Sequence, residues 1–100
     1  MVVHAKTGDE LSAEIAAGPV LVDFWAAWCG PCAMMGERIE GEVLPAVPGL
    51  KVVKVDVDEA PALAAQFGVT AIPALFCYRD GVQKASFAGV VPAADVIAAL

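Results

Sequence analysis

Cys29 and Cys32 are separated by two residues, and this Cys-x-x-Cys spacing is the strongest chemical pattern in the chain. The same spacing serves zinc sites, iron–sulfur clusters and redox-active dithiols. Cys77 is the third and last cysteine, so the chain has too few for a disulfide framework, and an odd number favours reactive or buried thiols. We expect Cys77, in an apolar segment, to be a buried free thiol, with a regulatory thiol as the alternative. A closed zinc site needs four ligands, and only Cys77 and His4 remain to complete one, so we expect no metal site.

The residues around the pair predict where its two sulfur atoms lie. Residues 20–25 form a predicted strand that is apolar on both faces except at Asp23, and such strands lie inside parallel sheets. A helix running toward Leu44 then begins at the Cys-x-x-Cys segment. Cys29 is therefore expected at a helix N-terminus, where unpaired N–H groups and the helix dipole stabilise a thiolate. Cys32 lies on the same side of the first turn and is expected to be more buried, so one sulfur can attack and the other resolve.

The two residues between the cysteines indicate the direction of the reaction. Pro31 has no N–H to donate to the Cys29 thiolate, and Gly30 has no side chain. A histidine between the cysteines would stabilise the thiolate and make the pair a stronger oxidant. The Gly-Pro pair therefore favours a reductant, which ends each cycle as a disulfide.

The elements that must position this pair alternate between strand and helix. Periodicity and turn signals predict strands over 2–5, 20–25, 51–57, 74–78 and 82–88, with helices following the first, second, third and fifth of them. A Thr-x-x-Glu capping box begins the first helix at Thr7, and Asp58 and Pro61 are start signals for the third. The order β-α-β-α-β-α-β-β-α predicts a mixed sheet covered by helices on both faces. At 100 residues, the chain is expected to be a single domain, 1–100.

Composition excludes several other classes of protein. The net charge of −6 and the absence of a basic stripe argue against nucleic-acid binding. The chain is 59% hydrophobic, but Pro61, Gly68 and Pro73 divide its longest uncharged stretch, so we expect no membrane span. Lys6 is soon followed by Asp9 and Glu10 with no apolar stretch between, which is unlike a secretory signal. We therefore expect a cytoplasmic protein.

The segment Trp28-Cys29-Gly30-Pro31-Cys32, preceded by Val22-Asp23-Phe24-Trp25, resembles the active site of the thioredoxin family. Further matches to the family pattern are Lys54, Asp58, Ile72-Pro73, Asp80-Gly81 and Gly89, with no insertion or deletion between Asp23 and Gly89. The resemblance covers nearly the whole chain. It implies an α/β thioredoxin fold, in which a central mixed five-stranded sheet is flanked by four helices.

The resemblance also implies a role for each residue of the catalytic segment. Cys29 attacks a client disulfide, Cys32 resolves the mixed disulfide, and Asp23 takes the proton from Cys32. Burial is expected to raise the pKa of Asp23, and Lys54 on the adjacent strand is its nearby cation. A solvated Asp23 on an edge strand is the alternative.

In the family the Ile72-Pro73 bond is cis and faces the cysteine pair, although the sequence alone shows only a proline at a strand start. The preceding backbone is then free to hydrogen-bond an extended client segment. The resemblance further implies an apolar docking patch around Cys29, formed with Pro73 by Trp28, Gly30, Pro31, Ala71, Ile72, Gly89 and Val90.

The family's chemistry implies a protein-disulfide reductase that binds no cofactor besides its own redox-active Cys29–Cys32 disulfide. A separate thioredoxin reductase, typically NADPH-dependent and flavin-containing, recharges the pair. Expected clients are ribonucleotide reductase, peroxiredoxin and methionine sulfoxide reductase, and the chain is expected to be a monomer. The alternatives are a binding subunit of a larger assembly and, with less support, a Cys-x-x-Cys metal module.

Two positions depart from the family pattern. Ala33 stands where a lysine usually follows the second cysteine, and Glu37 stands where a proline usually kinks the helix. We expect a straighter second helix unless Gly36 bends it, and weaker steering of partners.

Overall fold

A five-stranded sheet with the strand order β1-β3-β2-β4-β5 forms the centre of the computed structural model, which describes residues 1–100. The strands are β1 (Val2–His4), β2 (Pro19–Trp25), β3 (Lys51–Asp56), β4 (Ala74–Arg79) and β5 (Val82–Ala88). The helices are α1 (Gly8–Ile15), α2 (Gly30–Arg38), the π-helix η1 (Ile39–Val43), α3 (Pro61–Gln66) and α4 (Ala93–Ala98). The predicted order of strands and α-helices is confirmed, and η1 is an addition to it.

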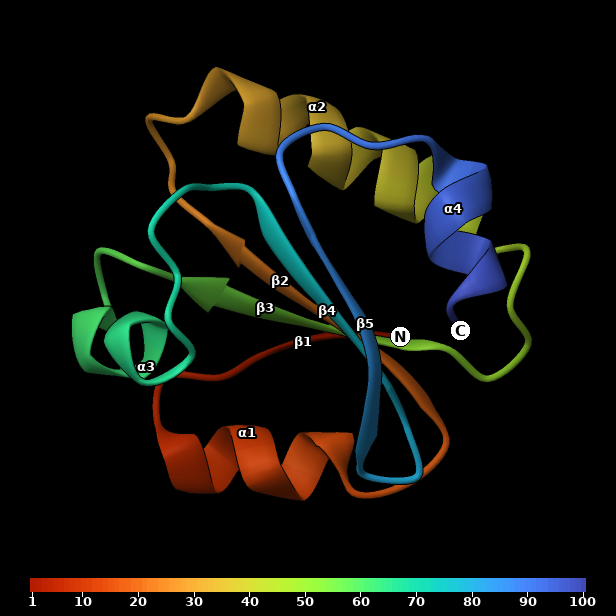
Figure 1. Ribbon diagram of the computed structural model, residues 1–100, viewed down its shortest axis with the longest axis horizontal. Coiled ribbons are helices and arrows are strands. Elements are labelled where there is room, and N and C mark those ends of the chain that lie inside the picture. The colour runs from red at the N-terminus through yellow and green to blue at the C-terminus, as the bar shows by residue number, and fades with distance from the viewer.

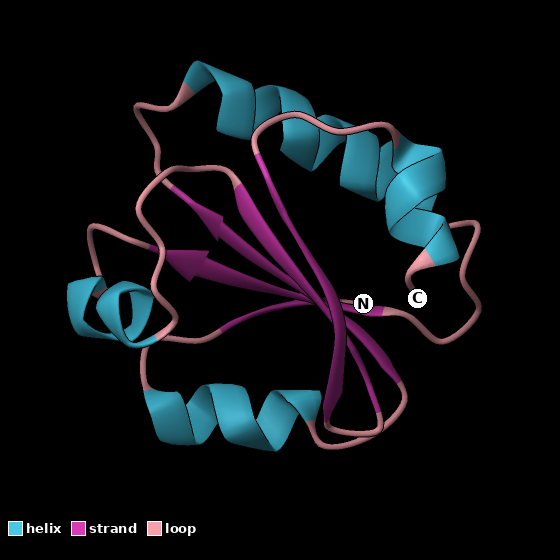
Figure 2. Ribbon diagram, in the orientation of Figure 1, coloured by secondary structure: helices cyan, strands magenta, loops and turns pink.

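The sheet is mixed, as the alternation of strands and helices predicts. Strands β1, β3 and β2 run parallel, whereas β4 is antiparallel to β2 and β5 is antiparallel to β4. Helices α1 and α3 cover one face of the sheet, and α2 and α4 cover the other (Figures 1 and 2). The central strand β2 is therefore buried on both faces, which explains its almost uninterrupted apolar sequence.

Each face of the sheet has its own core. On the α1 and α3 face, Phe24, Phe67 and Phe76 form an aromatic cluster with ring centroids 5.3 to 5.6 Å apart. On the opposite face, Leu21 of β2 packs with residues that include Met35 of α2. Because side chains alternate along a strand, Asp23 lies on the same side of β2 as Leu21, facing α2.

The first helix begins as predicted, and the third begins at Pro61 as predicted but without a cap from Asp58. Thr7 and Glu10 form a complete capping box at the start of α1. In α3 the N-cap is Ala60, with no side-chain hydrogen bond, and Pro61 begins the helix. Asp58 is therefore not a cap, because it lies too far before the first turn to reach the unpaired N–H groups.

The second helix, expected to be straighter unless Gly36 bends it, is not α-helical throughout. It begins at Gly30 with Cys29 as N-cap, but after Arg38 it continues as the π turn η1, where Leu44 N–H donates to the Ile39 carbonyl at 2.8 Å. The departure from α geometry therefore lies beyond Gly36. Such π turns within helices are frequent at functional sites. None of the helices is long and apolar enough to span a membrane.

Candidate active site

Cys29 and Cys32 form a disulfide at the N-terminus of α2, with their Cα atoms 5.2 Å apart. The backbone N–H of Cys32 donates to Cys29 Sγ at 3.2 Å, so the sulfur occupies the capping position of the helix. Cys29 is 7% exposed and Cys32 is 4% exposed. The expected order of burial is confirmed, and the helix N-terminus stabilises negative charge on Cys29 once the bond is reduced.

Asp23 lies at the centre of the sheet and is only 1% exposed. Burial raises the pKa of Asp23 to about 6, the charge of Lys54 opposes this rise, and the charge of Glu40 adds to it. The Oδ1 atom of Asp23 is buried without a hydrogen-bond partner. The carboxyl group is therefore easily protonated near neutral pH, which suits a group that accepts and releases a proton.

Lys54 is the direct neighbour of Asp23 in the sheet, because the two are register partners on the parallel strands β3 and β2. Lys54 takes part in none of the three salt bridges of the chain. Its Nζ atom lies 4.8 Å from the centroid of the Trp25 ring, in a cation–π contact. Lys54 thus acts on Asp23 through space rather than through an ion pair.

The segment before β4 faces the disulfide from the other side. The Ile72-Pro73 peptide bond is cis, as the family resemblance implies. The Ile72 carbonyl oxygen lies 3.9 Å from Cys29 Sγ, and Gly89 N–H donates to the Pro73 carbonyl at 2.8 Å. The segment is thereby held against the start of the loop that carries Val90, which is exposed.

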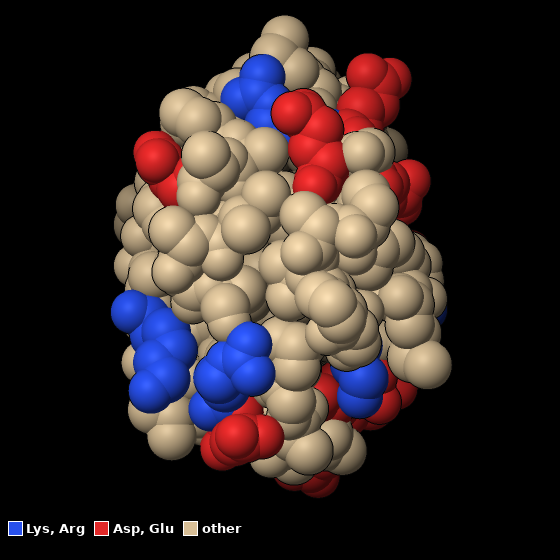
Figure 3. All heavy atoms as spheres, turned by 90° about the vertical axis from the view of Figure 1, so that its right-hand side faces the viewer, with Lys and Arg blue, Asp and Glu red and all other residues tan.

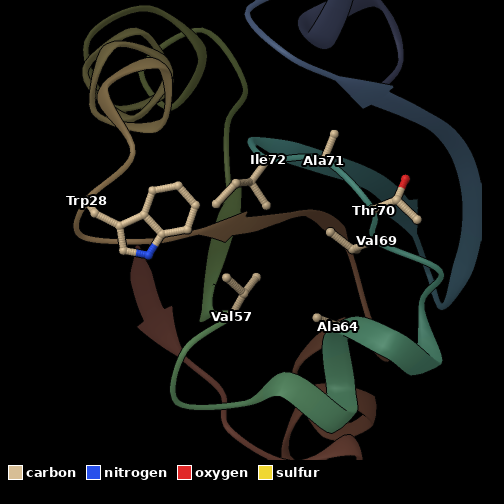
Figure 4. Close-up of a pocket in the computed structure, with 7 residues that line it drawn as sticks. All are labelled: Trp28, Val57, Ala64, Val69, Thr70, Ala71 and Ile72. Carbon is tan, nitrogen blue, oxygen red and sulfur yellow. The ribbon is translucent and has the colours of Figure 1, made fainter.

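An apolar pocket of about 190 Å³ opens beside Cys29 (Figure 4). Trp28 closes one end of it, and the indole is 70% exposed. The seven residues that line the pocket are Trp28, Val57, Ala64, Val69, Thr70, Ala71 and Ile72. Three of these belong to the expected docking patch, whereas Gly89 and Val90 lie outside this pocket. The other four were missed, although Val69 and Thr70 directly precede Ala71 in the sequence.

A second cavity, of about 320 Å³, borders both cysteines. Its lining comprises Trp25, Ala26, Ala27, Cys29, Cys32, Ala33, Gly36, Glu37, Glu40 and Lys54. Glu37 and Glu40 are both exposed, and the cavity places them on the side of the helix that carries the cysteines.

The remaining residues considered for chemistry lie away from this site. Cys77 is fully buried in β4, and burial raises the pKa of its thiol to about 11. Met35 is buried in the core, whereas the neighbouring Met34 is exposed. No three or more His, Cys, Asp or Glu side chains gather in a group that could hold a metal ion. Figure 3 shows charged side chains of both signs and no continuous basic stripe on the face that carries α4.

Sequence comparison with known proteins points to one family. The thioredoxin family model matches residues 2–100. Thioredoxin 1 of Synechococcus elongatus is 45% identical over 74 residues, which are 74% of this chain and 69% of that protein. Thioredoxin of Bacillus subtilis is 40% identical over 92 residues, which are 92% of this chain and 88% of that protein.

Solved structures agree with the sequence comparison. A mutant thioredoxin from Halobacterium salinarum superimposes with a TM-score of 0.84 at 33% identity, covering 97% of this chain and 85% of the other. Oxidized mitochondrial thioredoxin 3 from Saccharomyces cerevisiae superimposes with a TM-score of 0.82 at 32% identity, covering 93% of this chain and 88% of the other. With its mixed sheet and its cysteine pair at a helix N-terminus, this chain belongs to the thioredoxin family and is a dithiol–disulfide oxidoreductase with protein-disulfide reductase activity.

Proposed function

We propose that Cys29 is the nucleophile and Cys32 the resolving cysteine of a general protein-disulfide reductase. One observation carries this assignment: the sulfur of Cys29 is the N-cap of α2 and accepts the N–H of Cys32. Negative charge is stabilised at that position, and the thiolate is the attacking form of cysteine. Cys32 lies one turn further along the helix and is less exposed, as suits a sulfur that reacts only with its neighbour.

The reaction consists of two exchange steps. The Cys29 thiolate attacks one sulfur of a client disulfide, a Cys29–client bond forms, and the other client sulfur leaves as a thiolate that takes up a proton. Cys32 then loses its proton and attacks Cys29 Sγ, which closes the Cys29–Cys32 disulfide and releases the second client thiol. Two electrons pass from the cysteine pair to the client.

Asp23 is proposed as the group that takes the proton from Cys32, with Lys54 as its nearby cation. The pKa of about 6 supports this role, because a carboxyl group with that value is mostly ionised at neutral pH and still binds a proton readily. Lys54 is the adjacent register partner of Asp23 and lowers its pKa, so it favours the ionised form that can accept a proton.

The client docks, in this proposal, on the apolar surface around Cys29. The surface consists of Trp28, Gly30, Pro31, Ala71, Ile72, Pro73, Gly89 and Val90. The adjoining pocket of about 190 Å³ can accept one apolar client side chain next to the reacting sulfur. The position of the Ile72 carbonyl, 3.9 Å from Cys29 Sγ, supports a client backbone running past this segment.

We further propose that the chain acts as a monomeric single domain without a bound cofactor, in the cytoplasm or another reducing compartment. A separate NADPH-dependent flavoprotein reductase would return the Cys29–Cys32 disulfide to the dithiol, since each cycle consumes two electrons. Ribonucleotide reductase, peroxiredoxin and methionine sulfoxide reductase are the proposed clients. A similar structure, at 31% identity and a TM-score of 0.83, concerns thiol resolution in a yeast mitochondrial peroxiredoxin through glutathione and thioredoxin systems.

Reduction of insulin in the presence of dithiothreitol tests the assignment of the two cysteines. The wild-type protein should accelerate the reaction, and Cys29→Ser should abolish the acceleration. Reduced Cys32→Ser, mixed with insulin after dithiothreitol has been removed, should accumulate a mixed disulfide that non-reducing electrophoresis detects. The assignment is wrong if the wild-type protein and Cys29→Ser both give the rate of dithiothreitol alone.

A further inference from the structure

The cavity that borders both cysteines has two chemically different walls. One wall is a single face of α2 and η1, because Cys29, Cys32, Gly36 and Glu40 recur at helical spacings of three and four residues. The other wall is formed by strands β2 and β3, chiefly through Trp25 and Lys54. A cationic and an anionic side chain therefore border the same space beside the disulfide.

The ammonium group of Lys54 lies at this cavity between the Trp25 ring and the second helix. The flat face of Trp25 lies below it, with 4.8 Å between Nζ and the ring centroid. On the helix side, Nζ lies 3.9 Å from the point that a Cβ atom would occupy at Gly36. The positive charge of Lys54 is therefore positioned at the cavity although Lys54 forms no salt bridge.

Asp23 lies directly behind this second wall. It is the register partner of Lys54, and it points to the same side of β2 as Trp25, two residues later. From the other neighbouring strand, β4, its register partner is the uncharged Leu75. The charged and titratable groups on the α2 side are Lys54, the two cysteines, Glu40 and, at the outer part of the cavity, Glu37.

We propose that Glu40 is a positioning residue that, from across this cavity and against the charge of Lys54, controls the exchange of the Asp23 proton with solvent water in each catalytic cycle. This inference depends on the proposed function of Asp23 as the proton acceptor for Cys32. Asp23 takes one proton from the Cys32 thiol when the mixed disulfide is resolved, and it must lose that proton before the next cycle. The cavity of about 320 Å³, bordered by Lys54, Glu37 and Glu40, is large enough to admit water for this transfer.

The two charges act in opposite directions on the carboxyl group. Lys54 lowers the pKa of Asp23 and speeds release of the proton, whereas Glu40 raises the pKa and makes the carboxylate a better acceptor for the thiol proton. Together they keep the pKa of Asp23 low enough for the proton to leave and high enough for the carboxylate to accept the thiol proton. Glu42 provides the comparison, because it lies in the same π turn but outside the cavity, with its carboxylate 3.9 Å from Arg38.

Titration of the Asp23 carboxyl carbon by NMR in the oxidised protein tests the electrostatic part of the proposal. Glu40→Gln should lower the pKa of Asp23 by about half a unit, a roughly threefold change in its protonation ratio, since the charges interact across a solvent-open space. Lys54→Met should raise the pKa of Asp23. Glu42→Gln, the matched control, should leave it within experimental error of the wild type. Equal titration curves for Glu40→Gln and Glu42→Gln would overturn the proposal.

The pH profile of insulin reduction between pH 5 and 9 tests the catalytic part. The acidic limb of the rate should move to lower pH in Glu40→Gln and to higher pH in Lys54→Met, and it should be unchanged in Glu42→Gln. Asp23→Asn separates this inference from the proposed function. If Asp23→Asn keeps the wild-type profile, the role of Asp23 is wrong. If Asp23→Asn changes the profile and Glu40→Gln does not, only the role of Glu40 is wrong.

Discussion

The indole Nε1 of Trp28 donates a hydrogen bond to Oδ2 of Asp58 at 2.9 Å, across 30 residues of sequence. Trp28 directly precedes Cys29, and Asp58 follows strand β3. The bond ties the loop that carries the nucleophile to the loop that leads into α3. Because the indole is 70% exposed, this contact rather than core packing sets its position above the apolar pocket.

Asp58→Ala removes that contact and should weaken binding of a protein client. Loss of one exposed hydrogen bond costs about 1 kcal/mol, so the KM for insulin should rise about fivefold with little change in kcat. Asp58→Asn keeps an acceptor oxygen and should remain near the wild type. Steady-state kinetics of insulin reduction measure both variants, and equal KM values for the two would contradict the role given to the bond.

Ala64→Leu tests the apolar pocket beside Cys29. Ala64 lines the pocket, and a larger side chain there should raise the KM for insulin about fivefold or more, because it occupies the space proposed for a client side chain. Ala65→Leu, the next residue of α3, is exposed and serves as the control. The rate at which dithiothreitol reduces the Cys29–Cys32 disulfide should not change in either variant. A client KM unaffected by Ala64→Leu would show that the pocket is not a docking site.

Asp23→Asn should stabilise the protein above pH 6. The folded-state pKa of Asp23 is raised from 3.8 to about 6, so the folded state holds the proton more tightly than the unfolded chain does. This contribution to stability is complete below pH 3.8 and is lost as the pH rises through 6. At pH 7 the buried carboxylate therefore costs up to about 3 kcal/mol, which the uncharged asparagine does not.

Guanidinium unfolding of the oxidised protein at pH 4, 5.5 and 7 measures this difference. The stability gained by Asp23→Asn should be small at pH 4 and should grow toward pH 7. Asp95→Asn, at an exposed carboxylate on α4, is the control. A gain independent of pH would attribute the effect to packing rather than to the buried charge.

Cys77 should be unreactive while the protein is folded. Its burial raises the thiol pKa to about 11, so only about one molecule in a thousand carries the thiolate at pH 8. Mass spectrometry after treatment with iodoacetamide should find no modified cysteine in the oxidised folded protein and one, Cys29, in the reduced folded protein. All three should react after reduction and unfolding. Modification of Cys77 in the oxidised folded protein, at the rate of a free thiol, would contradict this.

Features that depend on neighbouring residues were predictable from the sequence. Local hydrogen bonding predicts the capping box at Thr7 and the placement of Cys29 at a helix N-terminus. Hydrophobic periodicity predicts the order of strands and helices along the chain. The burial of Asp23 also followed, because the apolar residues on both sides of it predict a central strand.

Contacts between distant segments were decided only by the tertiary structure. Asp58 was expected to help begin a helix, but folding brings it to Trp28, where its carboxylate accepts a hydrogen bond from the indole N–H. The position of Glu40 at the cavity depends on the π turn and on how α2 lies across Trp25 and Lys54. Sequence patterns encode hydrogen bonds and burial within one element, whereas the distance between side chains of different elements is set by how those elements pack.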